Sequence, residues 1–246
     1  MNVSVIIPCK NEAKQLPLLL DSLRQQTIAP NEVVVVDSNC TDDTIAIAKQ
    51  YRDTLQIHIA TATGPGVAAA RNTGALRVKG EMFLFTDADS ILPPKIIETL
   101  TAEITNRELD AGGFTQRMPS KRRGISFGAR LMNGYLRLMQ HTPWPIAFGS
   151  CLFVTKQTFT EMKGFDTTLF IMEDYDLIYR IKKYGKRVGI ISTQPFIGSD
   201  RRFTSERPHS IWRGVYAELY RYTHGMRVDK QLFRYDMGGQ SKEGEK

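Results

Sequence analysis

The first hundred residues alternate between short apolar runs and segments in which apolar residues recur every three or four positions. A short β-branched run predicts a strand, and the longer spacing predicts one face of a helix. We expect strands over 3–8, 33–36, 55–59 and 82–86, and helices over 16–23, 42–51 and 67–78. Thr41 is the expected N-terminal cap of the helix over 42–51. This alternation predicts parallel βαβ units, so the N-terminal half should be doubly wound α/β.

The pattern becomes less regular after residue 110. We expect isolated strands over 111–114 and 151–154 on either side of a basic stretch at 120–134, then a helix over about 173–184 and a strand over 188–191. Apolar residues between Ile211 and Met226 predict a further amphipathic helix. The length of 246 residues and the hydrophobic fraction of 41% fit one folded domain over 1–235, followed by a polar tail over 236–246.

Composition argues against several classes of protein. No run reaches the roughly 18 to 20 apolar residues that cross a bilayer, and a strand-like segment begins at Val3 without a basic leader. Three cysteines, Cys9, Cys40 and Cys151, are too few and too scattered for a disulfide framework. The four histidines lack metal-ligand spacing, and no serine lies in a G-x-S-x-G elbow. The sequence therefore favours a cytoplasmic protein that is not a triad hydrolase.

Carboxylates follow two of the predicted strands. Asp37 ends the strand over 33–36, and Asp87 and Asp89 follow the strand over 82–86. Ligands of open α/β sheets bind beyond the carboxyl ends of the strands. Asp87 and Asp89 could therefore hold one divalent cation or a ribose-diphosphate, and Asp37 could accept a hydrogen bond from a nucleobase or ribose. Acids at strand ends are also ordinary turn formers, so both interpretations stay open.

Arg71 lies early in a predicted helix that follows Gly64-Pro65-Gly66. The helix N-terminus and the guanidinium could hold an anion together, or Arg71 could be a surface residue. The glycines do not form a dinucleotide fingerprint, because that motif follows the first strand and these follow the third. We therefore reject a dehydrogenase.

The segment Glu173-Asp174-Tyr175-Asp176 opens a predicted helix. Asp174 shares the apolar stripe of Leu177 and Ile178 and should face inward, whereas Asp176 pairs at i+4 with Arg180 and should lie on a solvated face. Partial burial raises the pKa of a carboxylate, and such a group can take a proton from an attacking hydroxyl. The alternative for Asp174 is an acid that caps the helix.

Five stretches in this order resemble the family 2 glycosyltransferases with a GT-A fold. They are 3–8 with Asn11 and Glu12, 32–37, 70–74, 85–89, and 164–166 with Glu173 and Asp174, and they cover residues 1 to about 190. The resemblance implies a nucleotide-sugar-binding half over 1–100 and an acceptor-side half over 101–235. It also implies that Pro8, Glu12 and Asp37 line the nucleoside pocket, with Asp37 toward the base, and that Arg71 faces the nucleotide.

The remaining roles also follow from the resemblance. Asp87 and Asp89 match the D-x-D motif of the family, with Asp89 as the main ligand of Mn²⁺ or Mg²⁺ on the donor diphosphate. In the motif Glu173-Asp174 both acids would be catalytic residues, with Asp174 as the base. The implied reaction moves a sugar from a nucleoside-diphosphate sugar to an acceptor hydroxyl, with inversion at the anomeric carbon. Two alternatives are a nucleotidyltransferase, which should carry a glycine-rich first loop, and a non-catalytic sugar-nucleotide binder, which needs no base.

The formal net charge of +7 suggests a further partner. Basic residues between Arg117 and Arg137 come without any acid, and a second basic group lies between Arg201 and Arg227. Residues 199–203 resemble a segment of members with lipid-linked or membrane-proximal acceptors. We expect no nucleic acid partner, and we expect peripheral docking on the anionic inner face of a membrane. The alternatives are ordinary solvated charge and a C-terminal helix packed on the domain.

Overall fold

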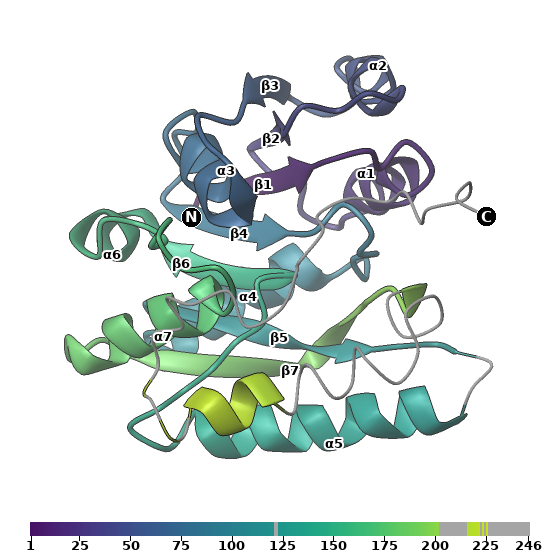
Figure 1. Cartoon of the computed structure of the whole chain (residues 1–246). Helices are drawn as coiled ribbons and strands as arrows, with labels where there is room; N and C mark the ends of the chain where they lie inside the picture. The colour runs from purple at the N-terminus through teal and green to yellow at the C-terminus, as the bar shows by residue number, and fades with distance from the viewer. Residues whose placement is uncertain (121–122, 202–215, 222, 224, 226–246) are drawn as a thin grey trace.

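Seven strands form one central sheet in the computed structural model, which describes residues 1–120, 123–201, 216–221, 223 and 225 (Figure 1). The strands are β1 (Val3–Cys9), β2 (Glu32–Asp37), β3 (Ile57–Thr61), β4 (Met82–Thr86), β5 (Ala111–Arg117), β6 (Cys151–Thr155) and β7 (Val188–Ile197). The helices are α1 (Leu16–Arg24), α2 (Thr44–Gln50), α3 (Gly66–Ala75), α4 (Ile96–Arg107), α5 (Arg123–Met139), α6 (Lys156–Glu161) and α7 (Glu173–Lys183).

The strand order places a switch point beside β1. The sheet runs β3-β2-β1-β4-β6-β5-β7, so the chain moves outward from β1 to β3 and then returns to add β4 on the other side of β1. Neighbouring strands are parallel except for β6, which is antiparallel to both β4 and β5. The loops that leave β1 and β4 therefore diverge at one sheet edge, where open α/β sheets bind ligands.

Helices cover both faces of the sheet, as the alternation of elements predicts. Alternate side chains of β1 point to opposite faces, so Val5 and Ile7 pack with α1, α2 and α4, whereas Ile6 packs with α3, α5, α6 and α7. The five residues Val5, Ile6, Ile7, Val34 and Val35 are fully buried. Burial on both faces explains why these strands read as continuous apolar runs rather than alternating ones.

Several local expectations are wrong. Asp43, not Thr41, precedes the first residue of α2, and Thr44 instead donates from its amide and hydroxyl to Asp42. The strands β5 and β6 are not isolated, because they pair with each other and with β7 and β4. Most of the basic stretch at 120–134 belongs to α5, which we did not predict, and β3 begins two residues later than expected.

The sheet runs through both predicted halves of the chain, while the division at residue 100 stays a prediction. Residues 216–221 of the predicted C-terminal helix are helical; Trp212, Arg202 and the tail over 236–246 lie outside the described residues. Within the described residues, the three cysteines are free, and no helix combines the length and the apolar character that a bilayer crossing requires.

We predict opposite effects of alanine at two helical glycines. A Cβ at Gly74 of α3 would lie 2.5 Å from Ile6 Cγ2 and 3.0 Å from Val36 Cγ2, so Gly74→Ala should cost about 1–3 kcal/mol through overpacking. A Cβ at Gly128 of α5 meets nothing within 4 Å, so Gly128→Ala should stabilise by about 0.5–1 kcal/mol through helix propensity. Urea unfolding of both variants checks this. A Gly74→Ala variant as stable as the parent would contradict the close packing of α3 on β1.

Candidate active site at the switch point

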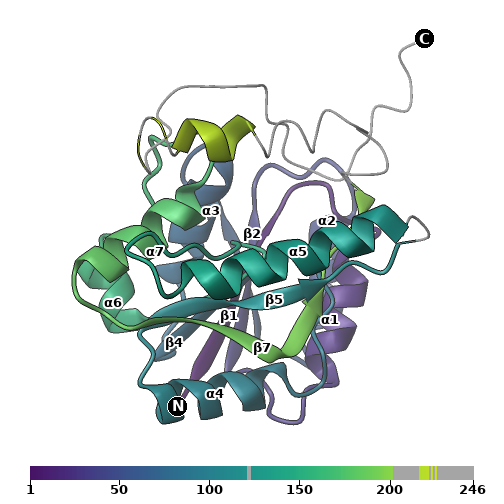
Figure 2. The same ribbon diagram turned by 90° about the horizontal axis from the view of Figure 1, so that it is seen from below.

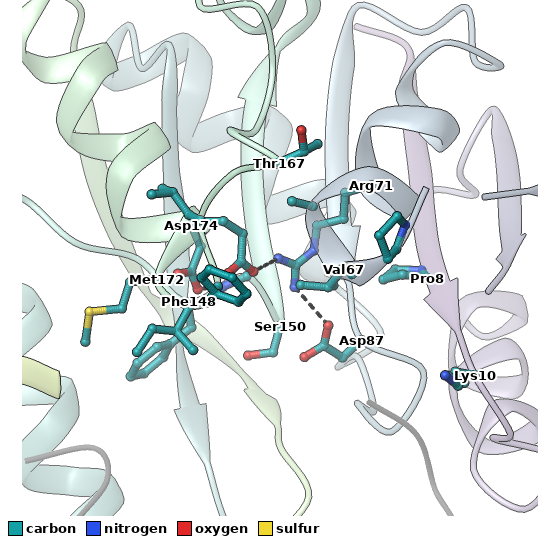
Figure 3. A pocket seen from close by; sticks show the side chains of 18 of the residues that line it. Pro8, Lys10, Val67, Arg71, Asp87, Phe148, Ser150, Thr167, Met172 and Asp174 are labelled. Carbon is teal, nitrogen blue, oxygen red and sulfur yellow. Dashed lines mark hydrogen bonds and ion pairs between the residues drawn. The ribbon is translucent and has the colours of Figure 1, made fainter. Parts of the chain in front are cut away.

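A cavity of about 790 Å³ opens at the carboxyl ends of β1 and β4 (Figure 3). One wall comes from Pro8 near the end of β1 and from Lys10 and Glu12 after it, and another from Asp87 and Asp89 after β4. The first turn of α3, residues 65–68, and the segment 167–174 that enters α7 complete it. Because the first N–H groups of a helix have no partner within it, the start of α3 offers donors and a partial positive charge to an anion in the cavity.

Arg71 connects three elements at the back of this cavity. Its side chain is only 4% exposed, and its guanidinium donates to Asp87 Oδ1 at 3.0 Å and to Glu173 Oε1 at 2.7 Å (Figure 3). Burial alone would lower the pKa of Arg71, but the negative charges of Asp87 and Glu173 outweigh that effect and raise it. Arg71 is therefore a buried cation that links α3, the end of β4 and the start of α7, not a surface residue.

Close packing fixes the guanidinium in place. The ring of Phe165 lies 5.4 Å from its central carbon, and a Cβ at Gly149 would lie 2.5 Å from Nη2. Asn72 donates to the carbonyl of Phe165 at 2.8 Å and accepts from its amide at 2.9 Å. Gly164 has a φ of 71°, and a Cβ there would lie 2.6 Å from Asn72 Oδ1. The stretches 70–74 and 164–166 therefore contact each other. This contact explains why both stretches occur in the sequence together with the acidic motifs 85–89 and Glu173-Asp174.

Asp174 faces the cavity from the first turn of α7. Its Oδ2 accepts from the Gly149 amide at 2.6 Å, and its Oδ1 accepts from the Tyr175 amide at 2.9 Å. Burial, assisted by the charge of Glu173, raises the pKa of Asp174 from 3.8 to about 7, against the opposing effects of Arg71 and the two amides. A carboxyl with a pKa near neutrality can exchange a proton under physiological conditions.

Glu12 and Asp89 both bind Arg201, which follows the end of β7. Arg201 donates to both carboxylate oxygens of Glu12 at 3.1 and 3.0 Å, and to Asp89 Oδ2 at 3.2 Å. Burial raises the pKa of Glu12, and the ion pair with Arg201 offsets this only in part. Arg201 therefore places a positive charge beside the two acids where the sequence led us to expect a nucleoside and a metal ion.

The donor set fits a divalent cation that shares its ligands with a substrate. Asp87 and Asp89 supply hard carboxylate oxygens from one cavity wall. The described part of the chain contains no group of three or more histidine, cysteine or acidic side chains close enough to hold a metal ion. A cation on Asp87 and Asp89 would therefore take its remaining ligands from phosphate oxygens and water, as Mg²⁺ commonly does.

The structure brings most of the predicted residues together. Seven of them line the cavity, namely Pro8, Glu12, Arg71, Asp87, Asp89, Glu173 and Asp174. Asp37 does not line it; it ends β2 beside Cys9, and its Oδ1 accepts from the Cys40 amide at 2.7 Å. Asp176 is also not on a solvated face, because it is 1% exposed and its Oδ2 accepts from Arg180 Nε at 2.7 Å.

Sequence reasoning missed three residues that shape the site. Lys10 lines the cavity, the Gly149 amide holds Asp174, and Arg201 binds Glu12 and Asp89. The sequence around Gly149 does not indicate this role, because the role depends on contacts with Arg71 of α3 and Asp174 of α7. Arg201 lies in the segment 199–203 that we singled out, but its contacts span 189 residues to Glu12 and 112 to Asp89, and periodicity does not reveal them.

Comparison with known proteins identifies the family. A model of glycosyl transferase family 2 matches residues 4–159, and one of glycosyl transferase family group 2 matches residues 82–239. The first match covers more than half of the chain. The chain therefore belongs to glycosyl transferase family 2, as the ordered motifs indicate.

Individual relatives agree with this assignment. The chain is 28% identical over 192 residues to an uncharacterised glycosyltransferase of Haemophilus influenzae, covering 73% of this chain and 61% of that one. It is 34% identical over 116 residues to the poly(ribitol-phosphate) beta-N-acetylglucosaminyltransferase TarS of Staphylococcus aureus, covering 45% of this chain and 20% of TarS. The chain thus spans less than two thirds of these relatives.

Two solved structures share the fold. The mannosyltransferase PcManGT of Pyrobaculum calidifontis, in complex with GDP-Man and Mn²⁺, superimposes with a TM-score of 0.69 at 24% identity, covering 88% of this chain and 61% of that chain. TarS 1–349 in complex with UDP-GlcNAc gives 0.64 at 23% identity, covering 81% and 58%. The predicted GT-A-type α/β fold is thereby confirmed.

We predict a large loss of stability when Arg71 is neutralised. Arg71→Met leaves Asp87 and Glu173 as uncompensated, partly or fully buried acids, so unfolding free energy should fall by about 3–5 kcal/mol. The control is Arg24→Met, which breaks an exposed pair with Asp21 and should change stability by less than about 1 kcal/mol. Adding Asp87→Asn and Glu173→Gln to Arg71→Met should recover part of the loss. Equal effects of Arg71→Met and Arg24→Met would contradict the buried link.

We predict that Asp174 makes the fold less stable at higher pH. Its folded-state pKa of about 7 lies above the ordinary 3.8, so the stabilising contribution is complete below about pH 4 and is lost as the pH rises through 7. Asp174→Asn stays neutral throughout, so its stability relative to the parent should increase by about 1 kcal/mol or more between pH 4 and pH 8. Thermal unfolding at several pH values measures this. A constant difference would show that burial does not raise this pKa.

Proposed function

We propose that the protein transfers a sugar from a nucleoside-diphosphate sugar to an acceptor hydroxyl with inversion at the anomeric carbon. The observation that carries the proposal is one cavity with two chemically distinct sides. Asp87, Asp89 and the start of α3 form the side suited to a diphosphate, while Asp174 presents a carboxyl with a raised pKa on the side of α7. The solved complexes of TarS with UDP-GlcNAc and of PcManGT with GDP-Man support this class of donor.

On the donor side, backbone N–H groups at the start of α3 and the ammonium of Lys10 would bind the diphosphate. Asp89, assisted by Asp87, would hold Mn²⁺ or Mg²⁺, which neutralises charge on the leaving diphosphate. The presence of Mn²⁺ beside GDP-Man in PcManGT supports this assignment. Pro8 and Glu12 would border the nucleoside. Asp37 does not line the cavity, and it would bind the nucleobase from the end of β2.

On the acceptor side, Asp174 would take the proton from the attacking hydroxyl. The acceptor oxygen then forms a bond to the anomeric carbon, and the bond from that carbon to the diphosphate oxygen breaks with its electron pair leaving on the diphosphate. Attack and departure on opposite faces of the sugar invert the configuration. Glu173, which we predicted as a second catalytic residue, would act through its bond with Arg71 and position the site.

The acceptor in this proposal is a hydroxyl of a cell-envelope glycan or glycolipid. Support comes from TarS, which is a poly(ribitol-phosphate) beta-N-acetylglucosaminyltransferase. In the same proposal the protein works in the cytoplasm at the inner face of the membrane, as its acid-free basic stretch suggests.

We predict that Asp174→Asn lowers kcat about 10²-fold or more while leaving the Kd of the nucleoside diphosphate near the parent value, because the base acts only on the acceptor. In the parent, activity should rise as the pH passes through about 7, where Asp174 loses its proton. Release of nucleoside diphosphate with acceptor present measures both effects. Asp53→Asn, at an exposed position, is the matched control. Turnover by Asp174→Asn equal to that of the control would remove Asp174 as the base.

We predict a different defect for Asp89→Ala. Calorimetric binding of the nucleoside diphosphate should lose its dependence on Mn²⁺, because the carboxylate that shares the cation with the diphosphate is gone. Asp53→Ala should keep that dependence. If Mn²⁺ strengthens nucleotide binding equally in Asp89→Ala and the parent, the cation binds elsewhere.

A further inference from the structure

The helix α5 presents two contrasting faces. Ala129, Leu136 and Met139 are buried against the sheet, and Asn133 bonds the backbone of Gln116 on β5 at 2.7 and 3.0 Å. On the opposite face the side chains of Phe127, Leu131 and Leu138 are 59%, 61% and 65% exposed. Their i, i+4 and i+11 spacing aligns them along one stripe, which we call the outer stripe of α5.

The outer stripe lies on the outside of the molecule. Figure 2 shows α5 as the outermost layer over β5. The neighbouring segment 216–221 contacts the helix through Tyr135, whose hydroxyl hydrogen-bonds to Glu218 and Arg221. Three large apolar side chains in line on one exposed helix face go beyond the scattered apolar residues of an ordinary surface.

Positive charge accompanies the stripe. Arg130 and Arg137 are exposed and lie on one flank of it, and α5 contains no acidic residue. Residues 111–160 contain no aspartate or glutamate at all. An amphipathic helix with a cationic flank and an apolar stripe is suited to the headgroup region of a bilayer, where arginines meet lipid phosphates and the stripe enters the acyl boundary.

We propose that the outer stripe of α5, with Arg130 and Arg137, docks the protein on anionic lipid. The outer stripe is then the surface that makes the membrane contact of the proposed function. This assignment rests on that membrane contact and not on the transfer reaction. A two-fold dimer through the same face fits less well, because each copy would bring Arg130 and Arg137 to an acid-free partner surface. A nucleic acid would leave the three apolar side chains without a suitable partner.

Sedimentation of the full chain with lipid vesicles tests the proposal. The parent should bind vesicles of mixed phosphatidylcholine and phosphatidylglycerol, and bind pure phosphatidylcholine at least about tenfold more weakly, with affinity falling as salt rises. Phe127→Ser/Leu131→Ser/Leu138→Ser should lose about tenfold or more of the affinity. Arg130→Gln/Arg137→Gln should lose about tenfold and most of the salt dependence.

The matched control is Leu18→Ser/Ile28→Ser/Leu76→Ser, which removes three exposed apolar side chains from α1, the following turn and the end of α3. It should bind like the parent. Transfer to a detergent-solubilised acceptor should stay unchanged in all three variants, since none of these residues lines the cavity. The Asp174→Asn variant should bind vesicles like the parent while it loses transfer, so the two measurements separate the proposed reaction from the proposed membrane contact.

Three results would overturn the proposal. The first is absence of vesicle binding by the parent, and the second is equal binding by the α5 triple variant. The third is a concentration-dependent dimer, seen by analytical ultracentrifugation without lipid, that the α5 triple variant abolishes, because that result would assign the outer stripe to a second copy of the chain.

Discussion

The buried guanidinium of Arg71 sets the relative positions of the two sides of the site. It joins Asp87, at the end of β4, to Glu173, at the start of α7, although these acids lie 86 positions apart in the chain. Each acid is followed by the residue proposed to act on substrate, Asp89 after Asp87 and Asp174 after Glu173. One cation therefore controls the separation between the proposed metal ligands and the proposed base.

This arrangement has an electrostatic consequence. Removing three charges from water costs several kcal/mol per ion unless they are paired and hydrogen-bonded, and Arg71 meets that requirement for both acids. Among the residues that the structure describes, Asp174 has no such ion pair. It takes two backbone amides instead, and burial beside Glu173 raises its pKa to about 7. The same burial that suits Asp174 to the proposed role of base at neutral pH lowers the stability of the fold once Asp174 is ionised.

Local patterns predicted the doubly wound half of the fold well, because its strands are buried on both faces and its acids stand at strand ends. They failed where a distant contact decides the outcome. Asp176 pairs with Arg180 as the i+4 spacing indicates, yet packing of α7 buries it fully. Asp37 ends its strand as expected but does not line the cavity at β1 and β4, so its role toward the base stays a prediction. For α5, three glycines and several arginines obscured an amphipathic helix that also carries Phe127, Leu131 and Leu138 on its exposed face.

A crystal structure of the protein with a nucleoside-diphosphate sugar and Mn²⁺ tests the central claim most directly. The account predicts the diphosphate between the start of α3 and Asp89, the cation on Asp87 and Asp89, and the anomeric carbon with the Asp174 carboxyl on the face opposite the diphosphate. A nucleotide bound outside this cavity, or a sugar whose leaving group lies on the same side as Asp174, would contradict it.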